Sequence, residues 1–310
     1  MRNPVKNAKE ALLHNRRHLL YALFHRLSWL IPNDKLYLRI YYRLSLKKKL
    51  NLDNPKDYNE KLQWLKLYNR QPEYVQMVDK LLVKDYVSQI IGKEYVIPTI
   101  GVWNSPKEID WDSLPSQFVL KTNHDGGGNG IVVCKNKVAL NRKKALRELY
   151  HSFNRNVYLI GREWPYKKVK RVVFAEQYME DEKTKELRDY KFFCFDGKVK
   201  ALYVATGRSQ YEKARFDFFD ENFNHLPITQ GHPLSDKPIE KPESFEVMKQ
   251  LASKLSAGIP HVRVDFYEVN GHPYFGEFTF FHLGGTGNFQ PEHWNRIFGD
   301  WITLPEKYND

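Results

Sequence analysis

The most constraining feature of this sequence is a long predicted hairpin over residues 261–279. Two apolar runs flank Asn270-Gly271, a dipeptide that strongly favours a tight turn between antiparallel strands. Each run carries one carboxylate among aromatic residues, Asp265 in the first and Glu277 in the second. Acidic side chains are rarely left inside a sheet unless a positive charge meets them. Two acids on neighbouring strands suit Mg²⁺, which takes a few carboxylate oxygens together with substrate phosphates.

This metal hypothesis depends on the register of the hairpin. A strict two-residue turn would pair Asp265 with Gly276, and the two acids would then face opposite sides of the sheet. A three-residue loop with Gly271 as a bulge, or a bulge in one arm, would bring both acids to one face. We therefore expect an odd-numbered loop or a bulge. The alternative is that Arg263, on the same face as Asp265, pairs with one acid while the other is exposed, and the residues alone leave both open.

Charge and composition narrow the classes of partner. The 310 residues carry a formal net charge of +12, and 42% are hydrophobic, enough for a sizeable core in one large domain or two small ones. This charge favours an anionic partner, such as a nucleotide, an acidic sugar, a nucleic acid or an anionic membrane surface. No recognised nucleic-acid-binding motif is present, so we expect no nucleic-acid partner.

Cysteine usage and hydropathy indicate the compartment. Cys134 and Cys194 both lie in apolar, strand-like runs, which is no disulfide framework and favours a reducing compartment. We find no signal peptide and no apolar run near the ~18 residues that a spanning helix needs. We therefore expect a cytoplasmic protein, with a peripheral position at the inner face of the membrane as an open alternative.

The first 50 residues predict basic helices. Leucines recur at roughly helical spacing through residues 1–31 with arginines between them, and Pro32 ends the pattern. A second helix is expected at about 35–46, followed by three consecutive lysines at 47–49. Such segments can lie on anionic membranes. An amphipathic stripe more often packs on its own domain, and we favour packing here.

Periodicity and turn residues predict the remaining elements. A capping box, Asp57 to Glu60, opens one helix, and Gly92 ends another that starts at Asp79-Lys80. The helices are expected at 61–68, 80–91, 141–151 and 242–257, and the strands at 94–98, 117–121, 131–134, 168–179, 189–195, 198–206 and 216–219.

A glycine-rich turn separates two of these strands. Lys121 ends the first strand, and residues 122–130 contain Gly126, Gly127, Gly128 and Gly130 before the return strand. Glycine lets backbone N–H groups approach an anion, and a nearby lysine adds positive charge. The pattern is neither a Walker loop nor a dinucleotide fingerprint. It indicates either a flap over phosphates or a simple flexible turn.

The order of these motifs resembles the ATP-grasp superfamily over about residues 79–291. The narrower resemblance is to TupA-like ATP-grasp proteins of bacterial surface-polysaccharide clusters. It is carried by Glu60-Lys-Leu-Gln-Trp-Leu-Lys66, by Asp189-Tyr-Lys-Phe-Phe-Cys-Phe-Asp-Gly197 and by Glu277-Phe-Thr-Phe-Phe-His-Leu-Gly-Gly285. The resemblance implies an α+β fold in which two lobes hold ATP between them. We expect a basic helical segment at 1–78, a lobe with the phosphate flap at 79–185 and a lobe with the metal-binding hairpin at 186–310.

The resemblance also implies roles for particular residues. Lys80 and Lys121 would contact the ATP phosphates, and the glycine flap would close over them. The backbone of Glu176, Gln177 and Met179 would meet the adenine edge. The metal ligands for one or two Mg²⁺ ions would be Asp265, Glu277 and Thr279. The superfamily usually has Asn at the third position, and a hydroxyl is a poorer ligand.

Further residues are implied for the reaction itself. Arg263 is a candidate for contact with the γ-phosphate or an acyl phosphate, and a salt bridge to Glu277 is the equal alternative. The backbone of Gly284 and Gly285 would face the reacting carboxylate. Lys191 and Arg208 would bind an acidic substrate, although strand-surface cations are the stronger alternative for both.

The implied activity is ATP-dependent ligation of a carboxylate to an amine through an acyl phosphate. The expected substrates are an acidic sugar or nucleotide sugar, such as a uronic acid, and an amino acid or small amine. The resemblance also implies that the basic N-terminus could contact a polysaccharide-assembly partner. The alternatives are a phosphotransferase on the same fold, a glycosyltransferase of the same pathway, or a basic membrane-surface or nucleic-acid-binding module. A glycosyltransferase would need a metal motif, and Asp110-Trp-Asp112 fits Asp-x-Asp but has the features of a turn.

Overall fold

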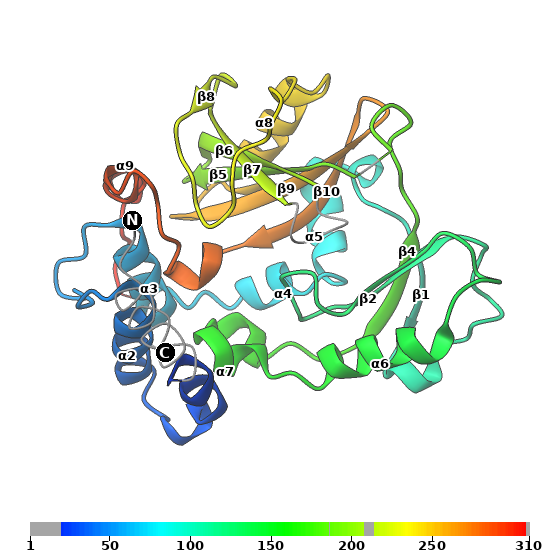
Figure 1. The fold of residues 1–310 in the computed structure, drawn as a ribbon, viewed down its shortest axis with the longest axis horizontal. Helices are drawn as coiled ribbons and strands as arrows, with labels where there is room; N and C mark the ends of the chain where they lie inside the picture. Colours follow the sequence, from blue (N-terminus) through cyan, green and yellow to red (C-terminus); the bar gives the residue numbers. More distant parts are fainter. Residues whose placement is uncertain (1–19, 186, 208–213, 308–310) are drawn as a thin grey trace, which may run out of the picture.

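Two antiparallel sheets organise the chain (Figure 1). The computed structural model describes residues 20–185, 187–207 and 214–307. A four-stranded sheet has the order β1-β4-β2-β3, and a six-stranded sheet has the order β10-β9-β5-β6-β7-β8. Each sheet has its own apolar core, so the α+β division into two lobes follows from burial as well as from strand pairing.

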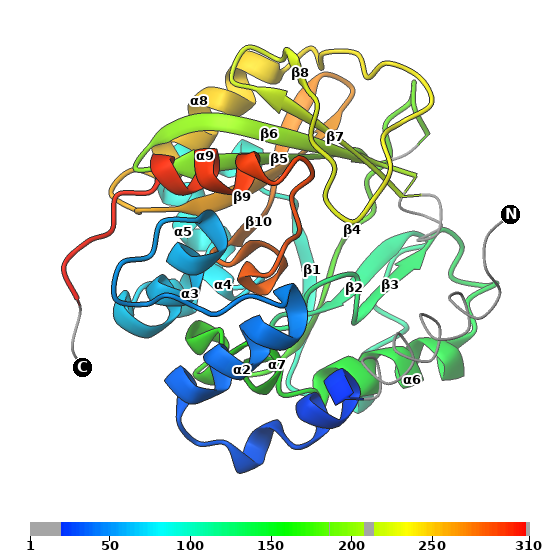
Figure 2. The ribbon, with the colours of Figure 1, turned by 60° about the vertical axis from the view of Figure 1, so that its left-hand side comes forward.

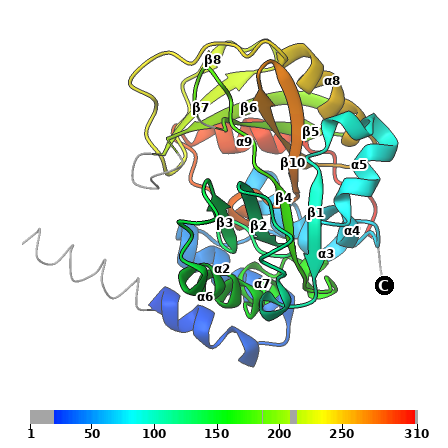
Figure 3. The ribbon, with the colours of Figure 1, turned by 90° about the vertical axis from the view of Figure 1, so that its right-hand side faces the viewer.

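The small sheet carries the glycine-rich turn. Its strands are β1 (Thr99–Trp103), β2 (Phe118–Thr122), β3 (Ile131–Cys134) and β4 (Val173–Gln177). Helix α6 (Arg142–Phe153), capped by the Asn141 side chain, packs against β2 and β3 (Figure 3). The glycine-rich turn therefore joins a central strand to an edge strand of this lobe.

The large sheet carries the hairpin from which the sequence analysis started. Its strands are β5 (Asp189–Phe195), β6 (Lys198–Thr206), β7 (Arg215–Asp220), β8 (His225–Leu226), β9 (Val262–Val269) and β10 (His272–Thr279). Helix α8 (Phe245–Leu255) contacts β5, β6 and β9, and Phe245 lies against Phe192. The opposite face presents Lys191, because side chains alternate across a strand.

The N-terminal helices belong to the core of the large sheet. These are α2 (Asp34–Leu46), α3 (Tyr58–Tyr68), α4 (Tyr74–Val78) and α5 (Val83–Ile91), and α3 lies beside the C-terminal helix α9 (His293–Trp301) (Figure 2). Tyr58 of α3 meets Phe193 of β5 and Phe298 of α9 edge to face. The predicted boundary at residue 78 falls between α4 and α5, which both contribute to this core.

Short helices complete the chain. They are η1 (Ser28–Leu30), η2 (Lys93–Tyr95), η3 (Pro106–Glu108), α7 (Val157–Gly161), η4 (Trp164–Lys167) and η6 (His282–Gly285). Residues 20–26 are helical, and Tyr21 and Phe24 pack on the large core, which agrees with the favoured packing of the N-terminal stripe. The rest of that predicted helix, residues 1–19, lies outside the described residues.

One predicted strand is wrong. Residues 94–98 do not form a strand: Lys93–Tyr95 is a 3₁₀ turn, and pairing with β4 begins only at Thr99. The reason lies at Pro98, which has no N–H to donate to a ladder and instead accepts from Gln177 N at 3.0 Å. The capping box of α3 and the bounds of β5 and β6 are confirmed.

Candidate active site

A bulge in the hairpin brings its two acids to the same face. The turn has two residues, Asn270 and Gly271, which both adopt positive φ and leave His272 opposite Val269. The register then shifts at Gly276, so that Glu277 lies directly opposite Asp265. The expected bulge is therefore present in the second arm rather than in the turn. A side chain at Gly276 would approach the Asp265 carbonyl oxygen to 3.2 Å, so the bulge is closely packed.

Two cations surround the Asp265 carboxylate. Arg263 donates from Nε to Oδ1 at 2.7 Å and from an Nη to Oδ2 at 2.7 Å. Lys191, which faces Asp265 across the strand pair, also binds Oδ2 and lies 2.9 Å from Asp189. Lys191 is buried, so the alternative of a strand-surface cation is wrong for this residue. The carboxylate of Asp265 is fully buried and neutralised from two sides.

Several side chains contact the guanidinium group of Arg263. Its main carboxylate partner is Asp265, and Glu277 lies 3.6 Å away, so the predicted alternative of a primary salt bridge to Glu277 is only a secondary contact. Arg263 also donates to Thr279 Oγ1 at 2.9 Å and to His282 Nδ1 at 2.7 Å. Because Nδ1 accepts, the other ring nitrogen of His282 carries the proton and donates to Gln230 Oε1 at 2.7 Å.

Glu277 links the two lobes. Its carboxylate lies 3.3 Å from Lys80 Nζ, which also donates to the Asp125 carbonyl oxygen in the glycine-rich turn at 2.6 Å. Burial disfavours the charge on Glu277, but Lys80, Lys191 and Arg263 outweigh it and hold the pKa of this carboxyl well below its usual range. Its side chain remains 30% exposed, so Glu277 is charged and open to a ligand.

A second ion cluster lies on the small sheet. Glu176 of β4 binds Lys121 of β2 at 2.5 Å and Lys84 of α5 at 2.7 Å. Burial opposes the charge on both Glu176 and Lys121, but their attraction prevails, lowering the pKa of Glu176 and raising that of Lys121. Sequence analysis missed Lys84, although it stands four residues after Lys80, one turn along the chain. Lys84 and Lys121 therefore share one carboxylate of the small lobe, whereas Lys80 pairs with Glu277 of the large sheet.

The glycine-rich turn has an anchored base and an open tip. Asp125 accepts from Arg155 and Ser152, at 2.9 and 2.8 Å. A side chain on Gly130 would lie only 2.3 Å from the hydroxyls of Ser152 and Thr122, so only glycine fits there. A side chain on Gly126 or Gly128 would meet nothing within 4 Å, and Gly127 only Asn129 at 3.7 Å. This arrangement suits a flap that moves at its tip while its base stays fixed.

The second glycine loop is held by helix α3. Leu283, Gly284 and Gly285 all adopt positive φ, a conformation that disfavours side chains such as that of Leu283. Gln63 donates to the carbonyl oxygens of Gly284 and Gly285 at 2.9 and 2.8 Å. Lys66 donates to the carbonyl oxygen of Gly284 at 2.8 Å. The motif that carried the family resemblance in α3 thus fixes the loop predicted to face the reacting carboxylate.

Among the predicted metal ligands, Glu277 is the one whose oxygen is best available to Mg²⁺. Magnesium binds through one or two carboxylates plus phosphate oxygens, and Glu277 offers an exposed charged oxygen. Asp265 lies on the same face, but two cations already engage its oxygens, and Thr279 accepts from Arg263. Among the described residues no group of three or more Asp, Glu, His and Cys side chains could hold a metal by itself. Phosphate oxygens would have to complete the shell.

The remaining predicted site residues lie at the edges of this space. Gln177 ends β4, and Met179 follows it in the segment that leads toward β5. Arg208 lies outside the described residues. The backbone roles of Glu176, Gln177 and Met179 stay predictions. The Asp110 motif is a turn, because its Oδ1 accepts from the backbone N–H of Asp112 at 3.1 Å.

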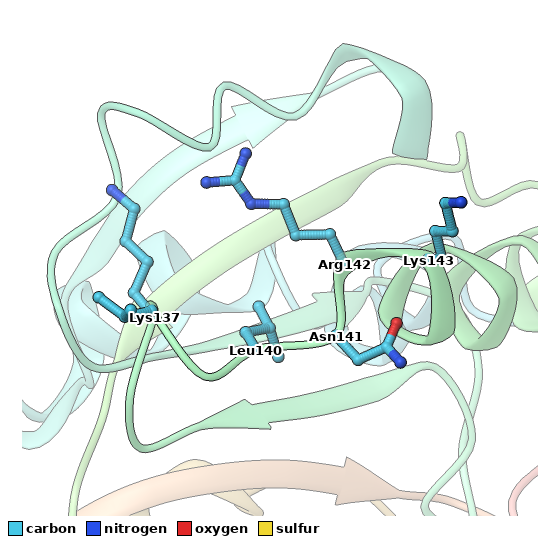
Figure 4. A pocket seen from close by; sticks show the side chains of 6 residues that line it. Lys137, Leu140, Asn141, Arg142 and Lys143 are labelled. Atoms are coloured by element: carbon cyan, nitrogen blue, oxygen red, sulfur yellow. The ribbon is translucent and has the colours of Figure 1, made fainter.

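A separate hollow of about 630 Å³ lies on the small lobe (Figure 4). It is lined by Lys137, Val138, Leu140, Asn141, Arg142 and Lys143. Lys137 bonds to the backbone just before β2, at 2.9 Å from Ser116, whereas the glycine-rich turn follows the other end of that strand. The hollow is therefore distinct from the ion clusters.

No helix in the described residues is long and apolar enough to span a membrane.

Two facing α+β lobes with lysines, a glycine flap and paired hairpin carboxylates define an ATP-grasp fold. The chain belongs to the TupA-like ATP-grasp family, whose sequence pattern matches residues 60–303. This confirms the resemblance found in the motifs. No curated protein matches the sequence.

Solved structures show similarity at low sequence identity. The D-alanine–D-alanine ligase from Helicobacter pylori is 15% identical with a TM-score of 0.43, covering 72% of this chain and 62% of that one. D-cycloserine synthetase DcsG is 15% identical with a TM-score of 0.42, covering 74% and 70%. The L-amino acid ligase from Bacillus licheniformis is 13% identical with a TM-score of 0.40, covering 71% and 45%. The chain thus spans 62% of the length of the Helicobacter pylori ligase.

Proposed function

We propose that this chain is an ATP-dependent carboxylate–amine ligase that works through an acyl phosphate. The observation that carries the proposal is the bulged hairpin, which sets Asp265 and Glu277 side by side beneath cations from both lobes. Membership of the TupA-like ATP-grasp family supports the same reaction class. The proposed substrates are a uronic-acid carboxylate of bacterial surface-polysaccharide biosynthesis and an amino acid or small amine.

The residues divide the first step between binding and charge stabilisation. Lys80, Lys84 and Lys121 would neutralise the ATP phosphates, and the glycine flap would cover them and exclude water. A substrate carboxylate would attack the γ-phosphate, forming a C–O–P linkage and releasing ADP. Arg263 would stabilise the charge that spreads over the transferred phosphoryl oxygens.

A divalent cation would add to this charge stabilisation. Magnesium held by Glu277, with Asp265 behind it, would supply Lewis-acid polarisation of the phosphate oxygens. Asp265 would also keep Arg263 oriented, because its two oxygens receive two parallel N–H donors from that side chain. The Gly284 and Gly285 backbone would position the carboxylate that becomes the acyl phosphate.

The decisive experiment measures ADP and phosphate release from MgATP. Uronic acids and UDP-uronates are supplied alone and then with pooled amino acids. Release that requires both an acid and an amine supports the ligase. Release with a hydroxyl compound and no amine would favour a phosphotransferase instead.

Two variants test the site assignment in the same assay. Lys121→Ala and Asp265→Asn should each abolish ATP turnover while circular dichroism shows a folded protein. Val138→Ser, a substitution at a side chain that is 97% exposed, is the control. Full activity in either site variant would refute the assignment.

A further inference from the structure

Glu163 carries a carboxylate that the proposed chemistry has not yet used. It lies between α7 and η4 and is half-buried. None of the residues that the structure describes forms a hydrogen bond or an ion pair with this carboxylate. Burial raises its pKa, and the charge of Lys66 acts in the opposite direction. Carboxylates in such positions are ordinarily paired, so a missing partner is informative.

The carboxylate lies beside the loop predicted to hold the acyl group. A side-chain Cβ on Gly284 would lie 3.9 Å from Glu163 Oε1. The same Cβ would lie 2.8 Å from the Tyr41 hydroxyl, so the three groups form one cluster. The Tyr41 hydroxyl in turn lies 3.2 Å from Thr286 Oγ1.

Tyr166 connects this cluster to the hairpin acids. Burial raises its pKa well above the ordinary value, and the negative charges of Glu163 and Glu277 both raise it further. The phenol therefore lies within electrostatic reach of both carboxylates. Glu163 itself lies beside Gly284 and belongs to neither ion cluster.

Lys66 does not neutralise Glu163 by a direct ion pair. Its ammonium instead donates to the carbonyl oxygens of Gly161 and Gly284, both at 2.8 Å. Those carbonyl groups hold the ammonium in place and leave the carboxylate of Glu163 open to a cation from outside. A primary ammonium suits such a carboxylate, because it is compact and can donate up to three hydrogen bonds.

We propose that Glu163 binds the ammonium group of the amine substrate and accepts one of its protons. The inference rests on the proposed ligase function and names the residue that serves its second substrate. Loss of this proton leaves a free amine, whose lone pair forms the C–N bond at the acyl carbon. The C–O bond to phosphate breaks, and phosphate leaves with that electron pair and takes the second nitrogen proton. Glu163 then returns its proton to solvent.

The experiment separates amide formation from acyl-phosphate formation. Glu163→Gln and wild type are assayed with MgATP and the pooled uronic acids and UDP-uronates, first with pooled amino acids and then with hydroxylamine. Hydroxylamine is uncharged at neutral pH and attacks an acyl phosphate without losing an ammonium proton. We expect the variant to lose about 100-fold or more in amide formation, with a raised KM for the amine, while hydroxamate formation persists.

Controls distinguish the possible failures. Glu306→Gln, at an exposed glutamate outside the site, should behave as wild type in both assays, and thermal unfolding should show that both variants are folded. If wild type itself shows no acid-dependent ADP release, the ligase proposal fails. If wild type forms the amide and Glu163→Gln forms it with the same rate and KM, the Glu163 inference is overturned alone. Equal loss of amide and hydroxamate formation in a folded variant also overturns the Glu163 inference. Glu163 would then be needed for formation of the acyl phosphate, before the amine reacts.

Discussion

Glu176 lies within 2.7 Å of two ammonium groups, those of Lys84 and Lys121. These ion pairs set the charge of the surface on which the small lobe would bind phosphate. This one carboxylate balances only one of the two ammonium charges, so the cluster keeps a net positive charge in the absence of a ligand. Removing one partner of a buried ion cluster is costly, because the remaining charges stay buried without compensation. The same carboxylate therefore stabilises the fold while it holds two cations ready at the site.

The Glu176→Gln variant tests this arrangement. We expect the free energy of unfolding to fall by about 3–5 kcal/mol, because two buried ammonium groups lose their common counter-charge. MgATP should restore more stability to the variant than to wild type, since phosphate oxygens would supply the missing negative charge. Thermal unfolding with and without MgATP measures both effects. An equal shift on adding MgATP to the two proteins would contradict the prediction.

Burial of His261 makes the free energy of unfolding depend on pH. Its Nδ1 donates to the Cys194 carbonyl oxygen at 3.0 Å, and its Nε2 accepts from the Tyr58 hydroxyl at 2.9 Å. These contacts require the neutral ring, and burial lowers its pKa from the ordinary 6.5 to about 3. Between these two values the unfolded chain binds a proton that the folded chain does not. Stability is therefore lost as the pH falls from 6.5 toward 3.

Replacing His261 should weaken this pH dependence. One proton corresponds to a slope of about 1.4 kcal/mol per pH unit in the free energy of unfolding. We expect His261→Gln to lose that part of the slope between pH 6 and 5, whereas His151→Gln, at an exposed histidine of α6, keeps it. Urea denaturation at several pH values gives the slopes. Identical slopes for wild type and His261→Gln would show that the ring is protonated in the folded state.

At the scale of elements, helix α3 joins the C-terminal loops to the core. Gln63 and Lys66 donate to the carbonyl oxygens of the left-handed loop at residues 283–285. Lys61 on the same helix donates to the carbonyl oxygens of Gly299 and Ile302, at 2.8 and 2.7 Å. Two lysines of one helix thus make the same kind of contact with two different segments. Only the loop at residues 283–285, which Lys66 contacts, is predicted to face the substrate.

This pair of lysines provides a matched comparison. We expect Lys66→Met to lower ligase turnover at least tenfold, about 1.4 kcal/mol in the barrier, because the loop loses a donor that fixes it. Lys61→Met should lower stability but leave turnover of the folded protein near wild type. MgATP affinity should persist in both, since the lysines proposed to bind phosphate lie elsewhere. Isothermal titration and steady-state assays make the comparison, and equal turnover in the two variants would refute a positioning role for Lys66.

At the scale of the whole molecule, the N-terminal segment has two apolar faces. One face, with Tyr21 and Phe24, packs on the large core. The other leaves five large apolar side chains exposed by 40–64%: Leu20, Leu23, Leu27, Trp29 and Leu30. Exposed arginines at positions 26, 39 and 43 adjoin this stretch in the sequence. An apolar face with a tryptophan and basic neighbours matches the composition of helices that lie on anionic bilayers.

The prediction for this face is binding to anionic vesicles. A triple variant, Leu23→Ser, Leu27→Ser and Leu30→Ser, should lower the affinity for phosphatidylserine vesicles about 100-fold or more, because each buried leucine contributes over ~1 kcal/mol. Val138→Ser, at an isolated apolar side chain of the small lobe, is the control. Vesicle co-sedimentation gives the affinities. Failure of wild type to bind, or unchanged binding by the triple variant, would contradict the prediction.

Sequence alone determined the local elements. The Asn270-Gly271 turn, the capping box of α3 and the alternating strands β5 and β6 all follow from neighbouring residues, because turn chemistry and side-chain period act over a few positions. The family and its ATP-grasp fold also followed from motif order. Sequence could require a bulge if the hairpin acids were to meet, but it could not place that bulge at Gly276.

Tertiary structure decided which distant residues complete the site. Sequence analysis assigned no site role to Lys84, Gln63 or Glu163, because the contacts that give them one are to residues about 90 to more than 200 positions away. Packing between distant elements places Lys84 of α5 against Glu176 of β4, and it places Gln63 of α3 and Glu163 beside the loop at residues 283–285. Burial fixes the charge and orientation of Lys84, because an ionised group removed from water must find its counter-charge or hydrogen bonds within the fold.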